Sequence, residues 1–235
     1  MTWWDHFLWW LGFSICHQQQ ERMLHYGSKP LFVCARDTGL FVGLFTTMAL
    51  LFLFARRFRN LPPSFYLLTL AGFAFFLWDS ITSYLGSRES SNLMRLLSGF
   101  SCGSGLALPL AFRVGLPALG PGEEGGRSLG LARTSAILIA SCVAMTAFLW
   151  RPEGLFRLAQ AYLFLSLVGS LTMLNFLLLL TFRDRKAKTP DGRGGSLPRP
   201  RRLMMGRGLT IVAAVGMAAL ELSAGHVLHS LALSG

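Results

Sequence analysis

Residues 161–182 read AYLFLSLVGSLTMLNFLLLLTF, a run without a single charged side chain. A helix needs about 20 mostly apolar residues to cross the roughly 30 Å hydrocarbon core of a bilayer. This run is long enough, and its apolar residues cover most of the helix circumference, unlike those of an amphipathic surface helix. It therefore predicts a transmembrane helix.

Five further stretches meet the same criterion, although the first of them is short and the third carries Arg95 one turn from its start. They are residues 38–55, 64–86, 92–112, 130–150 and 209–233. The sequence therefore predicts an all-α fold, a polytopic transmembrane helical bundle of about six spans in contact with the lipid bilayer.

The composition of the 235-residue chain agrees with this prediction. Hydrophobic residues make up 52% and charged residues 14%, and the mean hydropathy is +0.48. Soluble domains carry about 25% charged residues, so the chain lacks the polar surface of a soluble protein. The net charge of +11 could suggest a nucleic-acid partner. We expect none, because no aromatic residues alternate with the basic ones.

The 22 Lys and Arg residues are divided unevenly between the two ends of the predicted bundle. Fifteen lie in or beside the first, third and fifth connections, nine of them in residues 183–207. Basic residues are enriched in cytoplasmic loops, so we expect both termini outside, in the inner (plasma) membrane of a cell. We also expect the basic loop 183–207 to lie against anionic lipid.

The N-terminal segment differs from the spans, because four tryptophans crowd its first ten residues. It has neither the positive start nor the small-residue cleavage site of a signal peptide. Tryptophan prefers the membrane interface, which predicts an interfacial helix or a short re-entrant segment over residues 2–15. The chain then divides into an outer segment 1–37, a five-helix core 38–182, a basic loop 183–208 and a sixth transmembrane helix 209–235.

The outer segment carries a group of candidate metal ligands in two short motifs. These are Cys16-His17 and, eighteen residues after the first cysteine, Cys34 followed by Asp37. Cysteine, histidine and aspartate are metal ligands, and zinc and iron are the candidate ions. Two other interpretations remain open. Cys16 and Cys34 could form a disulfide on an oxidising outer face, or the cysteines could be packed and unpaired while Asp37 or the following threonine caps the first span.

A second group of polar residues is predicted at the same end of the bundle. Asp79 lies inside the second span, where an ionised carboxylate costs about 2.5–3.5 kcal/mol and needs a partner or water. Arg88, Glu89, Asn92 and Arg95 follow shortly after that span. They are interpreted either as a charged cluster with Asp79 or as an ordinary polar turn with Asn92 capping the third span.

The last span adds Glu221, His226 and His229. The two histidines are three residues apart and therefore share a helix face. Both point to the outer end, so they are additional candidates for the metal site, and Glu221 is a candidate for the polar cluster. The alternative is that each histidine is a satisfied residue of the core.

Two pairs of glycines have the small-xxx-small spacing that lets helices approach closely, Gly39 with Gly43 and Gly99 with Gly103. We interpret both pairs as packing positions. Cys102 and Cys142 lie in the middle of their spans and are interpreted as small apolar fillers.

The pattern resembles an uncharacterised family of prokaryotic predicted membrane proteins, a domain of unknown function with a CHQ, CARCTG and RES-x-N signature. Cys16-His17-Gln18 matches the first element, and Arg22 follows it. The second element is matched by Cys34-Ala35-Arg36 and Thr38-Gly39, and the third by Arg88-Glu89-Ser90 with Asn92. Asp37 stands where the family shows the second cysteine of CARC, so a dithiol mechanism at that position is not expected.

The sequence thus predicts an integral membrane protein with an outer-face Cys/His/Asp site that binds a metal, and it does not identify a reaction. One alternative is a non-enzymatic scaffold subunit or transporter that works with membrane-protein partners. Another is an enzyme for a lipid head group that uses the outer arginines as phosphate clamps.

Overall fold

The computed structural model describes residues 2–54, 64–111, 131–187 and 200–234. Six long helices dominate it, each long and apolar enough to cross a membrane, which confirms the predicted all-α transmembrane bundle. They are α2 (Ala35–Phe54), α3 (Ser64–Tyr84), α4 (Asn92–Leu110), α6 (Leu131–Trp150), α7 (Phe156–Ala187) and α8 (Pro200–Ser234).

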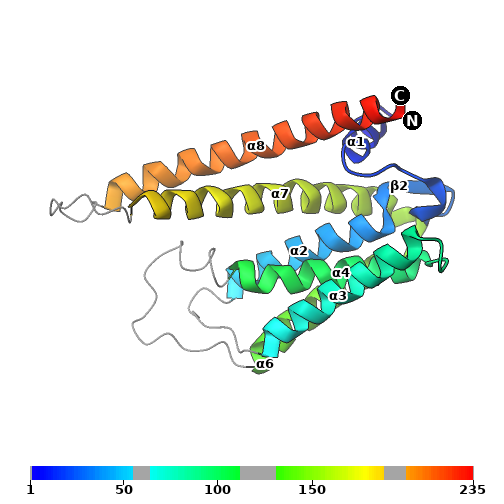
Figure 1. Cartoon of the computed structure of the whole chain (residues 1–235), viewed down its shortest axis with the longest axis horizontal. Coiled ribbons are helices and arrows are strands. Elements are labelled where there is room, and N and C mark those ends of the chain that lie inside the picture. Colours follow the sequence, from blue (N-terminus) through cyan, green and yellow to red (C-terminus); the bar gives the residue numbers. More distant parts are fainter. Residues whose placement is uncertain (1, 55–63, 112–130, 188–199, 235) are drawn as a thin grey trace.

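Smaller elements gather at one end of the bundle (Figure 1). Helix α1 (Trp3–Phe13) lies there with the start of α2 and the end of α8, and two 3-10 turns, η1 (Gln20–Arg22) and η3 (Glu153–Leu155), precede β1 and α7. Helix α1 confirms the predicted helix in the tryptophan-rich segment. Thr2 begins it with a capping box, in which its hydroxyl accepts from the Asp5 amide and the Asp5 carboxylate accepts from the Thr2 amide.

A β-hairpin in the same region departs from the all-α prediction. Strand β1 (Met23–Tyr26) pairs antiparallel with β2 (Lys29–Cys34) through a turn at Gly27, whose φ of +62° suits glycine. Three of the four β1 residues are buried, because both faces of the strand are covered. A strand covered on both faces has no alternation of apolar and polar residues, so the pattern gave no signal for it.

Helices α2 and α4 form the most extensive helix–helix contact among the described residues, and glycines allow the two backbones to approach closely. A Cβ on Gly39 would lie 2.2 Å from the Leu96 carbonyl oxygen, and one on Gly99 would lie 2.0 Å from the Arg36 carbonyl oxygen. Gly43 and Gly103 face backbone oxygens of the partner helix in the same way. The predicted packing role of the four glycines is confirmed.

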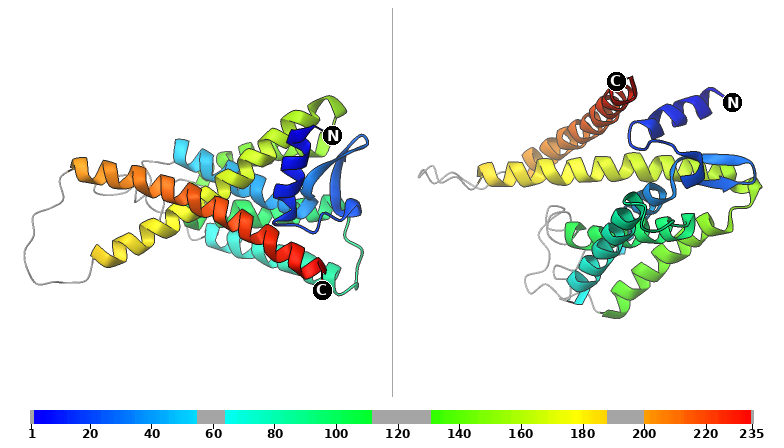
Figure 2. Two further views of the ribbon diagram at one scale, coloured as in Figure 1. Left: turned by 90° about the horizontal axis from the view of Figure 1, so that it is seen from above. Right: turned by 45° about the vertical axis from the view of Figure 1, so that its right-hand side comes forward.

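The other helices surround this pair. Figure 2 shows α8 crossing α7 on one side, with α1 beside the end of α8. A Cβ on Gly225 of α8 would lie 2.4 Å from the Ser14 carbonyl oxygen, so α8 closes against the segment that follows α1. On the other side, α3 leaves large apolar side chains exposed along its length, as expected for a helix that faces lipid.

The first span begins three residues earlier than predicted. Cys34 occupies the position before the helix, where its sulfur accepts a hydrogen bond from the Asp37 amide at 3.5 Å and its carbonyl accepts one from the Thr38 hydroxyl at 3.0 Å. The expectation that Asp37 or Thr38 caps this helix is therefore wrong, because both residues lie inside its first turn.

Candidate metal site

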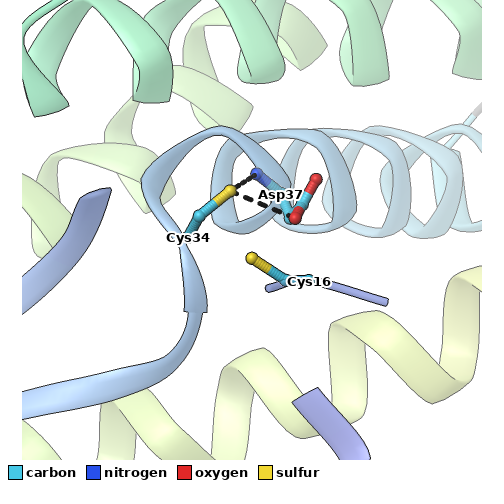
Figure 3. Close-up of side chains that lie close together, drawn as sticks. All are labelled: Cys16, Cys34 and Asp37. Atoms are coloured by element: carbon cyan, nitrogen blue, oxygen red, sulfur yellow. Dashed lines mark hydrogen bonds between the residues drawn. The ribbon is translucent and has the colours of Figure 1, made fainter. Parts of the chain in front are cut away.

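Three of the candidate ligands come together at the junction of the hairpin with α2 (Figure 3). Cys16 lies in the segment after α1, Cys34 ends β2, and Asp37 is in the first turn of α2. The two sulfur atoms and a carboxylate oxygen lie within 4.8 Å of one another. We call these three residues the thiol–carboxylate cluster.

Hydrogen bonds within this cluster satisfy its members. The Cys34 thiol donates to Asp37 Oδ2 at 3.1 Å, and the Asp37 amide donates to the Cys34 sulfur at 3.5 Å. The Cys16 sulfur is in contact with both the Cys34 sulfur and Asp37. Each of the two thiols carries one hydrogen, so the carboxylate and the neighbouring sulfur both have a donor within the cluster.

The two thiols differ in acidity because of this contact. Donation from Cys34 lowers the pKa of the Cys16 thiol below its usual range, against the opposing effect of burial. The pKa of the Cys34 thiol is raised, first because it is the donor to Cys16 and second because it is buried. Cys16 is therefore the sulfur that first becomes a thiolate, the form that binds metals and acts as a nucleophile.

Gln18 holds the Cys16 segment in place. Its side-chain amide donates to the Trp9 carbonyl at 2.7 Å and to the Phe32 carbonyl at 2.9 Å, joining α1 to β2. The backbone at Gln18 is left-handed, with φ of +51°, a conformation that side chains other than glycine, asparagine and aspartate adopt reluctantly. The glutamine of the CHQ motif is thus a structural clamp, a role that sequence reasoning missed.

Of the histidine candidates whose side chains are described, His17 and His226, neither joins the thiol–carboxylate cluster. His17 is exposed and lies outside it. The His226 ring lies tilted against Trp10 and edge-on to Phe13, with ring centroids 4.7 Å and 5.3 Å away. Its Nδ1 is buried and has no hydrogen-bond partner among the described residues. The side chain of His229 lies outside the described residues.

The second group is centred on Asp79, which is completely buried. Its Oδ2 accepts from Arg36 at 2.6 Å and from Ser98 at 3.0 Å, and its Oδ1 accepts from Arg88 at 2.7 Å and from Ser90 at 2.5 Å. The carboxylate therefore has four side-chain donors and two ion pairs. We call these five residues the Asp79 network.

The remaining members of the predicted polar cluster lie around or away from this network. Asn92 donates to two backbone carbonyls before and in β1, and accepts from Arg95 at 3.2 Å, so it ties α4 to the hairpin. Glu89 is exposed and outside the network. Glu221 accepts from Asn175 at 3.1 Å in the contact between α7 and α8, so the expectation that it joins the Asp79 group is wrong.

Sequence reasoning missed three residues of the network. Arg36 and Ser90 entered only as matches to the family signature, which did not indicate that they contact Asp79. Ser98 offered no signal, since serine is common and could have faced lipid.

Residues 16–108 match the family model described as Predicted membrane protein (DUF2085). The match begins at Cys16 and includes both the thiol–carboxylate cluster and the Asp79 network, while α6, α7 and α8 lie beyond it.

Two archaeal proteins of uncharacterised function are similar to the chain. One, from Methanothermobacter thermautotrophicus, is 33% identical over 94 residues, which are 40% of this chain and 82% of that protein. The other, from Methanocaldococcus jannaschii, is 32% identical over 92 residues, 38% of this chain and 56% of that protein. No solved structure matches the chain.

Proposed function

Since the chain belongs to the DUF2085 family of predicted membrane proteins, we propose that its thiol–carboxylate cluster is a metal site at the outer end of the bundle. The observation that carries the proposal is the convergence of Cys16, Cys34 and Asp37 ligand atoms within 4.8 Å. Cys34 and Asp37 are neighbours across the start of α2, but Cys16 lies eighteen residues before Cys34 in a separate segment, so the fold and not the sequence spacing brings the second sulfur to them.

Zinc is the ion that this donor set favours. Two sulfur ligands of a tetrahedral zinc ion lie about 3.8 Å apart, because each Zn–S bond is about 2.3 Å long. The cluster would therefore need only a small contraction. Two thiolates and one carboxylate leave a fourth position for water or a substrate, as in catalytic zinc sites. Thiolates favour zinc over calcium and magnesium, which prefer oxygen ligands.

The arrangement of the helices supports an outer location. The helix ends that adjoin residues 55–63, 112–130 and 188–199 lie at the end of the bundle opposite to the cluster (Figure 1). These three segments contain eight Arg and Lys residues and three acidic residues. Positive charge marks the cytoplasmic side, so we assign the cluster and both ends of the chain to the outer side.

The structural alternative is that Cys34 only caps α2, with Cys16 packed beside it or joined to it by oxidation. All four cysteines have free thiols in the structure. The metal content and the thiol count of the purified protein separate the three interpretations, because each gives a different pair of values.

Cys34→Ala is expected to reduce zinc content at least tenfold, because the remaining thiolate and carboxylate cannot hold a zinc ion tightly. Wild-type protein, purified in detergent and dialysed against micromolar zinc, is expected to retain one ion per chain by mass spectrometry. Cys142→Ala is the matched control, since Cys142 is an exposed cysteine in α6 and should leave the zinc content unchanged.

A wild-type protein that retains no zinc would contradict the proposal. Two free thiols under denaturing conditions would then identify a Cys16–Cys34 disulfide, and four would identify a cap with a packed neighbour. If no metal is bound and membrane proteins co-purify in fixed ratio, the scaffold alternative is favoured instead.

A further inference from the structure

A pocket of about 360 Å³ lies beside the Asp79 network, between η1, the start of α2 and the last turns of α3. Its polar lining consists of Arg22, Arg36, Ser80, Ser83 and Tyr84. All five side chains can donate hydrogen bonds, and no carboxylate is among the described residues that line the pocket.

Positive charge around this pocket exceeds negative charge. Asp79 forms ion pairs with Arg36 and Arg88. Neither Arg22 nor Arg95 has a carboxylate within ion-pair distance in the described part of the chain. Four guanidinium groups therefore lie around one buried carboxylate that forms ion pairs with only two of them. Arg95 is close enough to Arg22 and Arg36 for their charges to repel it.

Two of the lining residues hold polar atoms that have no partner. Arg22 Nε and Ser80 Oγ are buried and make no hydrogen bond within the described chain. A buried donor without an acceptor costs free energy, so such atoms are rare unless a bound group supplies the acceptor. Arg36 commits its Nε and Nη2 to Asp79, which fixes the guanidinium and leaves its Nη1 for another acceptor.

The outer wall of the pocket faces lipid. Ile81, Tyr84 and Leu85 line it and are 53%, 89% and 69% exposed. They lie at the end of the span Phe65–Tyr84, the depth at which head groups meet the hydrocarbon core. Trp78, one turn earlier and 48% exposed, stacks under Arg88 at 4.5 Å. Exposed tryptophan and tyrosine at a span end are typical of the membrane interface.

We propose that Arg22 and Arg36 form an anion site that binds a phosphate group at the membrane interface. Guanidinium groups bind phosphate through paired, charge-assisted hydrogen bonds, and the hydroxyl groups of Ser80 and Ser83 add neutral donors. An anion here offsets the uncompensated positive charge. The phosphate comes from a lipid head group or from solution, and the exposed apolar wall favours the lipid. The site does not depend on the proposed metal.

Arg22→Gln tests the proposal, because Arg22 lies in the pocket but outside the Asp79 network. Lys29→Gln is the matched control, since it removes one positive charge at the same end of the bundle from an exposed pair with Glu153. Binding to the full chain in detergent is measured by native mass spectrometry with three probes. These are dioctanoyl phosphatidic acid, dioctanoyl glycerol without phosphate, and inorganic phosphate.

Wild type and Lys29→Gln are expected to bind phosphatidic acid, and Arg22→Gln is expected to bind it about tenfold or more weakly. Weak binding of dioctanoyl glycerol would show that the phosphate is recognised. Inorganic phosphate bound as tightly as phosphatidic acid would identify free phosphate as the source. Equal binding by wild type and Arg22→Gln, or no binding of either phosphate probe by wild type, would overturn the proposal. If Arg22→Gln does not fold, Ser80→Ala on the α3 wall provides the same comparison.

Discussion

Asp79→Ala is expected to lower the free energy of unfolding by about 3 kcal/mol. The change leaves Arg36 and Arg88 without their shared carboxylate. Removing one partner of a buried ion pair costs about 3–5 kcal/mol, and we take the lower end because the two arginine side chains are 19% and 31% exposed.

An opposing effect is small at this position. Removing a carboxylate from a span favours insertion by up to about 3 kcal/mol when the residue is at the bilayer centre. Asp79 is five residues from the end of its span, so in a separated helix it can reach the interface, and most of that gain is absent. The loss of the ion pairs therefore outweighs the gain in insertion, and the free energy of unfolding falls.

The measurement is unfolding of the detergent-solubilised protein by a denaturing detergent, followed by tryptophan fluorescence. Glu89→Ala is the control, because Glu89 is an exposed carboxylate outside the network, and its loss should change stability by less than about 0.5 kcal/mol. If Asp79→Ala and Glu89→Ala unfold at the same concentration of denaturing detergent, the Asp79 network does not stabilise the bundle.

Gly99→Ala is expected to cost about 2–3 kcal/mol by forcing α2 and α4 apart. The added methyl group would lie 2.0 Å from the Arg36 carbonyl oxygen, and the carbonyl belongs to a helix that cannot rotate it away. Overpacking a close contact costs about 1–3 kcal/mol, and we expect the upper part of this range because backbone meets backbone. Alanine's higher helix propensity returns at most about 1 kcal/mol.

Gly216→Ala is the matched control for this substitution. It makes the same chemical change inside the long helix α8, where a Cβ would meet nothing within 4 Å. The same detergent unfolding should therefore show Gly216→Ala close to wild type or slightly more stable. Equal stability of the two variants would contradict the close contact between α2 and α4 in the solubilised protein.

Hydropathy was sufficient to predict the six spans, because each needs only a long apolar run and no knowledge of its neighbours. The glycine spacing also predicted the close helix contact, although it did not say that the two glycine pairs contact each other. The hairpin was missed, because both faces of β1 are covered and its residues show no alternation.

Which residues contact one another in the polar sites was harder to predict than the end of the bundle at which these sites lie. The sequence put the candidates at one end of the bundle, but the partner of a side chain depends on the rotation of its helix. The Asp79 network needs Arg36 and Ser98 to face the same point from α2 and α4, and the glycine contact sets that geometry. His226 faces the aromatic residues of α1 for the same reason.

The first turn of α2 places Arg36 and Asp37 next to each other, one facing the phosphate pocket and the other the thiol–carboxylate cluster. A helical turn moves as a unit, so a ligand that shifts this turn at one site changes the geometry at the other. Thermodynamic linkage makes any such effect reciprocal. A tenfold change in zinc affinity caused by an anion would require a tenfold change in anion affinity caused by zinc, so one titration reports on both.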